Sequence, residues 1–238
     1  MSTEPLLTVE DLHAFYGRAH ILHGVSLSVA AGEVVALMGR NGAGKSTTLR
    51  SIMGLVEDRR GRVTFAGQDV SRLSPHRIAR LGLGYVPEDR RIFAGLTVLE
   101  NLEVGRHPPR PGAPVWTIER LFDLFPNLAE MRHRPGGRMS GGEQQMLTIA
   151  RTLMGNPRLI LLDEPSEGLA PRIVEMMAEA IATVKREGLA VLLCEQSLPF
   201  AGLVAGRAVV IATGEVRHVG PMAGLMADGE TRRAYLAV

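Results

Sequence analysis

Short apolar runs alternate with amphipathic segments along the chain, and this alternation is typical of a mostly parallel α/β sheet. Residues 34–38, 159–162 and 190–194 are almost continuously apolar. Strands of this kind are expected where helices or a second layer cover both faces of the sheet. The pattern therefore predicts three central, parallel strands at these positions.

Two other sets of segments predict antiparallel pairing. Residues 7–9, 26–29 and 62–65 alternate apolar and polar positions, which indicates an edge layer near the N-terminus with one face in solvent. Residues 208–213 and 215–219 are separated by a single glycine, and they predict a closing hairpin.

The middle of the chain has a different pattern. Residues 98–104, 118–124 and 140–154 have helical spacing, and residues 106–114 contain four prolines and predict a loop. We therefore expect a helical lobe inserted into an α/β core. The predicted boundaries are residues 1–88 and 157–238 for the nucleotide-binding core and residues 89–156 for the helical lobe.

Composition narrows the class of protein. With 238 residues, 45% of them hydrophobic and 22% charged, the chain can bury a core of one large domain. A net charge of +2 is too small to argue for a nucleic acid as partner. Cys194 is the only cysteine, which excludes an intrachain disulfide and is read as a small buried apolar side chain.

Neither a signal peptide nor a membrane span is predicted. Residues 1–12 lack a basic segment followed by an apolar stretch. Residues 201–214, the least polar stretch, fall short of the ~20 apolar residues that cross a bilayer. A role at a membrane therefore has to come through a partner subunit.

The first motif that carries chemistry directly follows the apolar run at residues 34–38. It has two glycines separated by four residues, then lysine and serine, as in a phosphate-binding loop. Its members are Gly39, Arg40, Asn41, Gly42, Ala43, Gly44, Lys45 and Ser46, with Thr47 next. Glycines let backbone N–H groups surround phosphate oxygens, Lys45 supplies a cation for the β- and γ-phosphates, and the Ser46 hydroxyl can ligate Mg²⁺.

A glycine-rich turn is the alternative interpretation of this motif. Only two of the 27 basic residues are lysines, Lys45 and Lys185. By composition alone, a chance match is on the order of a few in a thousand, so the phosphate loop is favoured.

The second motif is the apolar run 159–162, which ends in Asp163 and Glu164. In α/β sheets, ligand-binding groups stand at the ends of strands. Asp163 is predicted to hold Mg²⁺, and Glu164 to act as the general base for the attacking water. A strand leaving the core often ends in acidic residues for no such reason, so this motif gains its weight from the phosphate loop.

The third motif is the segment Ser140, Gly141, Gly142 and Glu143. Ser140 followed by Glu143 predicts a capping box at the start of a helix. The amides at such a helix start can also receive an anion.

Together the three motifs resemble those of the ATPase subunits of ABC transporters, in that family's order and spacing, over essentially the whole chain. The resemblance implies a P-loop NTPase of the ABC ATPase type that binds ATP and Mg²⁺. It further implies a head-to-tail pair of ATPases in which Ser140 and Gly142 of one chain contact the γ-phosphate held by Lys45 of the other. Gly141 and Glu143 belong to the same predicted nucleotide-binding segment. Tyr16 lies where the family places an aromatic side chain that stacks on adenine; an ordinary edge-strand aromatic is the alternative.

Three positions depart from the family pattern. Glu88 stands where the family usually has a switch-loop glutamine, Gln196 where it often has a histidine, and Ala170 where many relatives have aspartate. Glu88 can still ligate Mg²⁺. Gln196 can donate to a γ-phosphate oxygen but carries no charge. The catalytic residues are thus expected to be Glu164, Lys45 and Gln196.

These departures, with the ending Arg233, Ala234, Tyr235 and Leu236, resemble the second ATPase of branched-chain amino-acid importers. That resemblance implies uptake of branched-chain or other small amino acids or amides through separate transmembrane permease subunits. The expected partners are a second ATPase, identical or a sister subunit, and indirectly a periplasmic or extracellular solute-binding protein. It also implies a peripheral location at the cytoplasmic face of the cell membrane, where the surface around Arg90 and Arg91 receives a permease helix; a solvated arginine pair is the alternative.

Three other functions are compatible with parts of the sequence. An ATPase of lipid or lipopolysaccharide export shares the length and many of the motifs and is the main alternative. A soluble ABC protein acting on nucleic acid or ribosomes usually has two ATPase domains or a long coiled-coil insertion, which this chain lacks. A P-loop kinase or GTPase does not account for residues 140–143. The seven histidines are scattered without metal-ligand spacing, so no zinc site is predicted.

Overall fold

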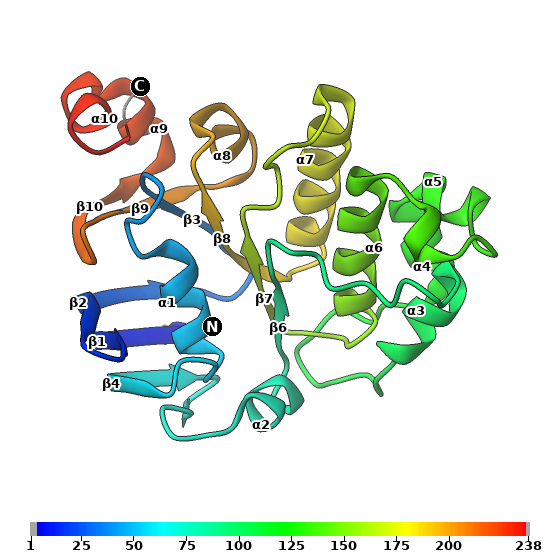
Figure 1. The fold of residues 1–238 in the computed structure, drawn as a ribbon, viewed down its shortest axis with the longest axis horizontal. Helices are drawn as coiled ribbons and strands as arrows, with labels where there is room; N and C mark the ends of the chain where they lie inside the picture. The colour runs from blue at the N-terminus through cyan, green and yellow to red at the C-terminus, as the bar shows by residue number, and fades with distance from the viewer. Residues whose placement is uncertain (1–3, 237–238) are drawn as a thin grey trace.

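The computed structural model describes residues 4–236, which form two β-sheets with helices packed around them (Figure 1). The larger sheet has the strand order β10-β9-β3-β8-β7-β6, and the smaller one has the order β2-β1-β4-β5. The larger sheet is parallel except for its edge strand β10. The strands are β1 (Leu7–Tyr16), β2 (Ala19–Val29), β3 (Val34–Met38), β4 (Asp58–Phe65), β5 (Gln68–Asp69), β6 (Leu83–Val86), β7 (Leu159–Asp163), β8 (Ala190–Glu195), β9 (Arg207–Ala212) and β10 (Glu215–Pro221).

The helices occupy the connections between these strands. They are α1 (Lys45–Ile52), α2 (Pro75–Arg80), α3 (Val98–Val104), α4 (Ile118–Leu124), α5 (Pro126–Glu130), the 3₁₀ turn Gly136–Arg138, α6 (Gly141–Leu153), α7 (Pro171–Arg186), α8 (Leu198–Val204), α9 (Met222–Ala227) and α10 (Gly229–Tyr235). No helix in the described part of the chain is long and apolar enough to cross a membrane.

The predicted fold class is confirmed: a mostly parallel core sheet, an antiparallel N-terminal layer and a helical segment inserted between β6 and β7. The three apolar runs are β3, β7 and β8, and the predicted hairpin is β9 and β10. Strands β1 and β2 are much longer than the alternating pieces predicted. Register shifts and the positive φ of Asp11 (49°) break their alternation, so the pattern shows only parts of each strand.

The continuous apolar runs arise because the side chains of each central strand pack into two separate hydrophobic clusters, one on each face of the sheet. In β3, Val34, Ala36 and Met38 face one cluster, which includes helices α6 and α7. Val35 and Leu37 face the other cluster, which includes α1 and the antiparallel sheet. Both faces of the strand are therefore dry, as the sequence pattern predicted.

The helices α3 to α6 lie between β6 and β7 in the chain and stand to one side of the sheet, in green in Figure 1. Val98, Leu121 and Met146 of these helices share one hydrophobic cluster with the sheet, and Trp116 is buried in it. The helices therefore share one core with the sheet. The division into a core and a lobe at residues 89–156 stays a prediction.

Strand order brings the ends of three strands together. Met38 at the end of β3 pairs with Glu195, and Asp163 at the end of β7 pairs with Cys194. The carboxyl ends of parallel strands form the usual ligand-binding edge of such a sheet. The loops after β3, β7 and β8 therefore meet at one place.

Candidate active site

The loop after β3 is a turn that leaves backbone amides free at the start of a helix. A side chain at Gly39 would collide with the carbonyl of Ile211, and Gly44 has a φ of 109°, which disfavours any other residue. Gly44 caps α1 without a side-chain hydrogen bond. The first amides of α1 thus have no partner from a capping side chain and can receive a phosphate.

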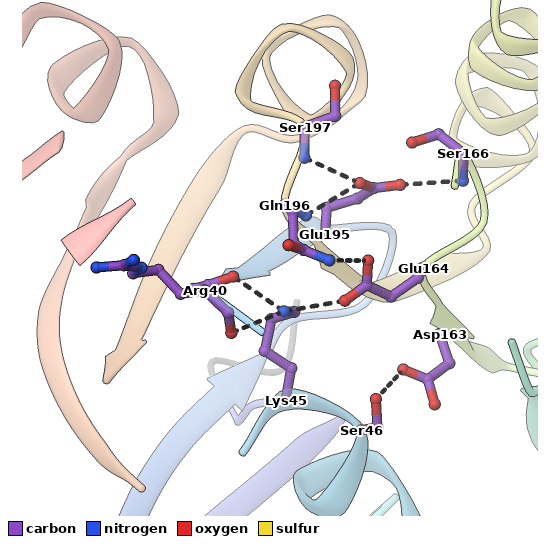
Figure 2. A network of polar contacts seen from close by, with 10 residues as sticks. Arg40, Lys45, Ser46, Asp163, Glu164, Ser166, Glu195, Gln196 and Ser197 are labelled. Carbon is purple, nitrogen blue, oxygen red and sulfur yellow. Dashed lines mark hydrogen bonds and ion pairs between the residues drawn. The ribbon is translucent and has the colours of Figure 1, made fainter. Parts of the chain in front are cut away.

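Lys45 is the cation at the centre of this loop (Figure 2). Its side chain is buried, and its Nζ donates to the carbonyl oxygens of Gly39 at 2.9 Å and Arg40 at 3.2 Å. The same Nζ forms an ion pair with Oε1 of Glu164 at 2.9 Å. A buried ammonium is tolerated because all three partners are oxygen acceptors. The Arg40 side chain itself points away from this cluster.

Glu164 follows β7 directly and is held in a strained conformation. Its φ is 50°, a left-handed value that costs a non-glycine residue free energy and is found mostly at functional sites. Its backbone N–H donates to the carbonyl of Cys194 at 3.0 Å. Its Oε2 accepts a hydrogen bond from Nε2 of Gln196 at 2.8 Å, so the carboxylate lies between Lys45 and Gln196 (Figure 2).

Asp163 and Ser46 form a second polar pair. The Ser46 hydroxyl donates to Oδ1 of Asp163 at 2.8 Å, and the Tyr85 hydroxyl donates to Oδ2 at 3.2 Å. Burial raises the pKa of Asp163, while the two hydroxyls oppose that rise. Burial and the neighbouring Asp163 also raise the pKa of Tyr85, which keeps the phenol protonated.

The pair fits a magnesium ion whose remaining ligands come from a bound nucleotide and water. Mg²⁺ is usually held by one or two carboxylates together with substrate phosphates and water. Here a carboxylate oxygen and a hydroxyl oxygen already lie within hydrogen-bond distance beside the phosphate loop. Glu88, the third predicted ligand, is exposed on the wall of the adjoining cavity.

A cavity of about 460 Å³ opens in front of the phosphate loop. It is lined by predicted site residues from four separate parts of the chain: Tyr16, Asn41, Gly42, Gly44, Lys45, Ser46, Thr47, Glu88 and Glu164. Tyr16 is 48% exposed at its edge, and a stacking role needs such an accessible ring face. Ala43 does not line the cavity; its carbonyl accepts from Gly214 and ties the loop to the β9–β10 turn.

Two residues of this site were not predicted from the sequence. Glu167 lines the cavity. Burial is the main cause that raises its pKa, and the negative charges of Glu164 and Glu88 raise it further. Tyr85 reaches Asp163 because β6 pairs with β7. The only sequence signal for Glu167 is its position three residues after Glu164, and β6 itself was not recognised as a strand.

The segment Ser140 to Glu143 lies away from this cavity. Ser140 caps α6 by accepting from the Glu143 amide at 3.4 Å, and Oε2 of Glu143 accepts from the Ser140 amide at 2.7 Å. The predicted capping box is therefore confirmed. Gly141 lies beside the Arg90 guanidinium and Gly142 beside Ile173, and none of the segment lines the cavity that Lys45 lines. One chain by itself does not bring the two motifs together.

A glycine-rich loop at a helix start, a buried lysine within it and a strand-end Asp–Glu pair define the chain as a P-loop nucleoside triphosphatase. The chain belongs to the ABC transporter family, whose sequence model matches residues 22–167, more than half of its length. Members of this family hydrolyse ATP, form dimers and work with transmembrane permease subunits.

Two kinds of curated relative are similar over almost the whole chain. The high-affinity branched-chain amino acid transport ATP-binding protein BraG of Pseudomonas aeruginosa is 40% identical, covering 97% of this chain and 99% of BraG. The lipopolysaccharide export system ATP-binding protein LptB of Haemophilus influenzae is 35% identical, covering 97% of both chains.

Solved structures are similar in fold over the same length. The ADP conformation of MJ1267, an ATP-binding cassette of an ABC transporter, has a TM-score of 0.80 at 27% identity, covering 97% of this chain and 98% of that one. A bacterial Atm1-family ABC exporter with ATP bound has a TM-score of 0.81 at 26% identity, covering 98% of this chain and 43% of that one.

Proposed function

We propose that this chain is the ATPase subunit of an importer for branched-chain amino acids, or for other small amino acids or amides. It would work peripherally at the cytoplasmic face of the membrane, with separate permease subunits and a solute-binding protein outside. The observation that carries this proposal is the 40% identity to BraG across nearly the full length of both chains. The relative LivF of Archaeoglobus fulgidus, named as a probable branched-chain amino acid transport ATP-binding protein, is 34% identical over 90% of this chain.

In the proposed mechanism, water attacks the γ-phosphoryl group of ATP in line with the leaving oxygen. Glu164 accepts the proton of that water, and Gln196 holds the Glu164 carboxylate by the hydrogen bond seen at 2.8 Å. Lys45 exchanges its contact with Glu164 for the β- and γ-phosphates when ATP binds. Ser46, Asp163 and Glu88 would hold Mg²⁺, which when bound would neutralise charge on the phosphates.

The site is completed by a second ATPase chain in this proposal. The start of α6 offers the Ser140 hydroxyl and the amides of Gly141 and Gly142, and Ser140 is exposed. A helix start with exposed donors suits a γ-phosphate presented by another chain. The second chain is either another copy or a sister ATPase.

A groove of about 540 Å³ is the proposed docking place for a permease helix. Leu55, Phe93 and Val104 line it and are each about half exposed, and apolar side chains that gather in one exposed groove mark an interaction site. Arg91 and Tyr85 line it as well, and Tyr85 also contacts Asp163. A helix seated there would therefore touch the residue that reaches the proposed magnesium site.

The second candidate function is lipopolysaccharide export, which the 35% identity to LptB supports. Reconstitution in liposomes distinguishes the two. We expect the chain, assembled with its permease and solute-binding subunits, to drive ATP-dependent uptake of labelled leucine or another small amino acid or amide. Absence of uptake, with lipopolysaccharide extraction by the same assembly instead, would overturn the importer proposal.

Replacing Ser140 with alanine tests the role of the α6 start. We expect S140A to lower ATP hydrolysis at least 10-fold, because a γ-phosphate donor is lost in addition to a helix cap worth about 1 kcal/mol. The matched control is Thr97→Ala, since Thr97 caps α3 in the same kind of capping box with Glu100. Steady-state phosphate release and thermal unfolding of both variants are the measurements. Equal losses of activity in T97A and S140A would show that only the cap matters.

A further inference from the structure

Glu195 is a buried carboxylate that joins the loop after β7, which carries the proposed general base, to the loop after β8, which carries Gln196 (Figure 2). It is the last residue of β8 and is 1% exposed. Its Oε1 accepts from the backbone amide of Ser166 at 3.1 Å. Its Oε2 accepts from the backbone amides of Gln196 at 3.1 Å and Ser197 at 3.2 Å.

Burying the Glu195 carboxylate costs free energy, so its contribution is better sought in the position of those loops than in stability. Burial raises the pKa of the Glu195 carboxyl, and the Ser166 side chain, followed by the amides of Ser197 and Ser166, opposes that rise. A buried carboxylate adds little net stability, because the free energy of losing water offsets most of what its hydrogen bonds return. The three hydrogen bonds instead fix the spacing between the loop after β7 and the loop after β8.

That spacing sets the geometry of the general base. Ser166 lies two residues after Glu164, and Gln196 directly follows Glu195. The hydrogen bond from Gln196 to Glu164 spans the gap between the same two loops at 2.8 Å. Glu164 also has the strained φ of 50°, which persists only where neighbouring groups hold the backbone.

We infer that Glu195 is a positioning residue for ATP hydrolysis: by tying Ser166 to Gln196, it keeps the Gln196 amide on Glu164. The inference rests on the roles proposed above for Glu164 and Gln196. A glutamine side chain is among those that lose most rotamer entropy when they are ordered. A fixed backbone at both ends of the contact lowers the number of arrangements in which the contact is missed.

Glu195→Gln is the first test. The glutamine side chain has the same length as glutamate, but its NH₂ group cannot accept a hydrogen bond. The backbone amides on that side lose their acceptor, so the hydrogen bonds to one of the two loops are lost. We expect kcat for ATP hydrolysis to fall about 10- to 100-fold with KM for ATP changed less than about twofold. An unchanged kcat would overturn the inference.

A double-mutant cycle with Gln196→Ala separates positioning from general structural damage. If Glu195 acts through Gln196, E195Q lowers kcat less than about twofold further once the Gln196 side chain is gone. The same factor with and without Gln196 would overturn the positioning role while leaving Glu164 as the base. Wild-type turnover in both Q196A and E164Q would instead overturn the proposed site itself.

Two further variants keep the test independent of folding. In Glu195→Asp, the shorter side chain can still meet the adjacent amides of Gln196 and Ser197 but not Ser166, so we expect the same loss of kcat as in E195Q. A normal kcat in E195D would exclude the tie to Ser166. Glu33→Gln is the matched control, because Glu33 accepts from the Ala30 amide and pairs with Arg207 just before β3, at the opposite end of the sheet. Its kcat should stay at the wild-type value even if its Tm falls as far.

Discussion

The Glu164→Gln protein is expected to bind ATP and to release almost no phosphate. Glutamine keeps the shape of the side chain and the contact with Gln196, but it cannot accept the proton of the attacking water. Loss of a general base lowers turnover about 10²- to 10⁴-fold. The substitution also removes the negative partner of Lys45, now 2.9 Å away, so ATP affinity should equal or exceed that of the wild type.

Two measurements on the same preparation check this result: ATP binding by titration and phosphate release over time. Glu175→Gln is the control, since Glu175 is an exposed carboxylate on α7 and its loss should change neither quantity. Phosphate release by E164Q at the wild-type rate would remove Glu164 from its assigned role.

Replacing Lys45 with alanine is expected to abolish useful ATP binding. The ammonium would make charge-assisted hydrogen bonds to two phosphates, and together these correspond to a loss of affinity of about 100-fold or more. The control is Lys185→Ala, which removes the only other lysine of the chain from the last turn of α7. Equilibrium binding of ATP to both variants gives the comparison. Unchanged affinity in K45A would contradict the phosphate-loop assignment.

A double variant separates the ligand contact from the fold. K45A leaves Glu164 buried without its cation, which destabilises a protein by about 3–5 kcal/mol. K45A combined with E164Q removes both charges, so we expect thermal stability to recover while ATP affinity stays low. Recovery of ATP affinity in the double variant would show that Lys45 acts only on stability.

The parts of the fold that were predicted are those in which all consecutive residues of a segment are buried to the same degree. Strands β3, β7 and β8 are dry on both faces, so their sequences are simply apolar and their positions follow from that. The phosphate loop is read equally directly, because its glycines, Lys45 and Ser46 are consecutive. Strand β6 was missed because it has four residues and includes Gly84 and a half-buried Tyr85.

The contacts that shape the site could not be read from the sequence. The hydrogen bond between Ser46 and Asp163 joins residues 117 positions apart, and the one between Tyr85 and Asp163 joins residues 78 apart. Strand order decides these contacts, and no local pattern encodes it. The same holds for Glu195, which by sequence is a charged residue directly after an apolar run and in space ties the loop after β7 to the loop after β8.

The central claim is that ATP is hydrolysed between the phosphate loop of one chain and the α6 start of another, and in the purified wild-type protein that other chain is a second copy. Mixing two inactive proteins tests it most directly: Lys45→Ala, which lacks the first half, and Ser140→Arg, in which an exposed position carries a side chain too large for a nucleotide to approach. Random pairing gives mixed dimers with one intact site. At concentrations where the wild type is active, the mixture should therefore regain up to about a quarter of wild-type phosphate release. A mixture no more active than the average of its two components would contradict the claim.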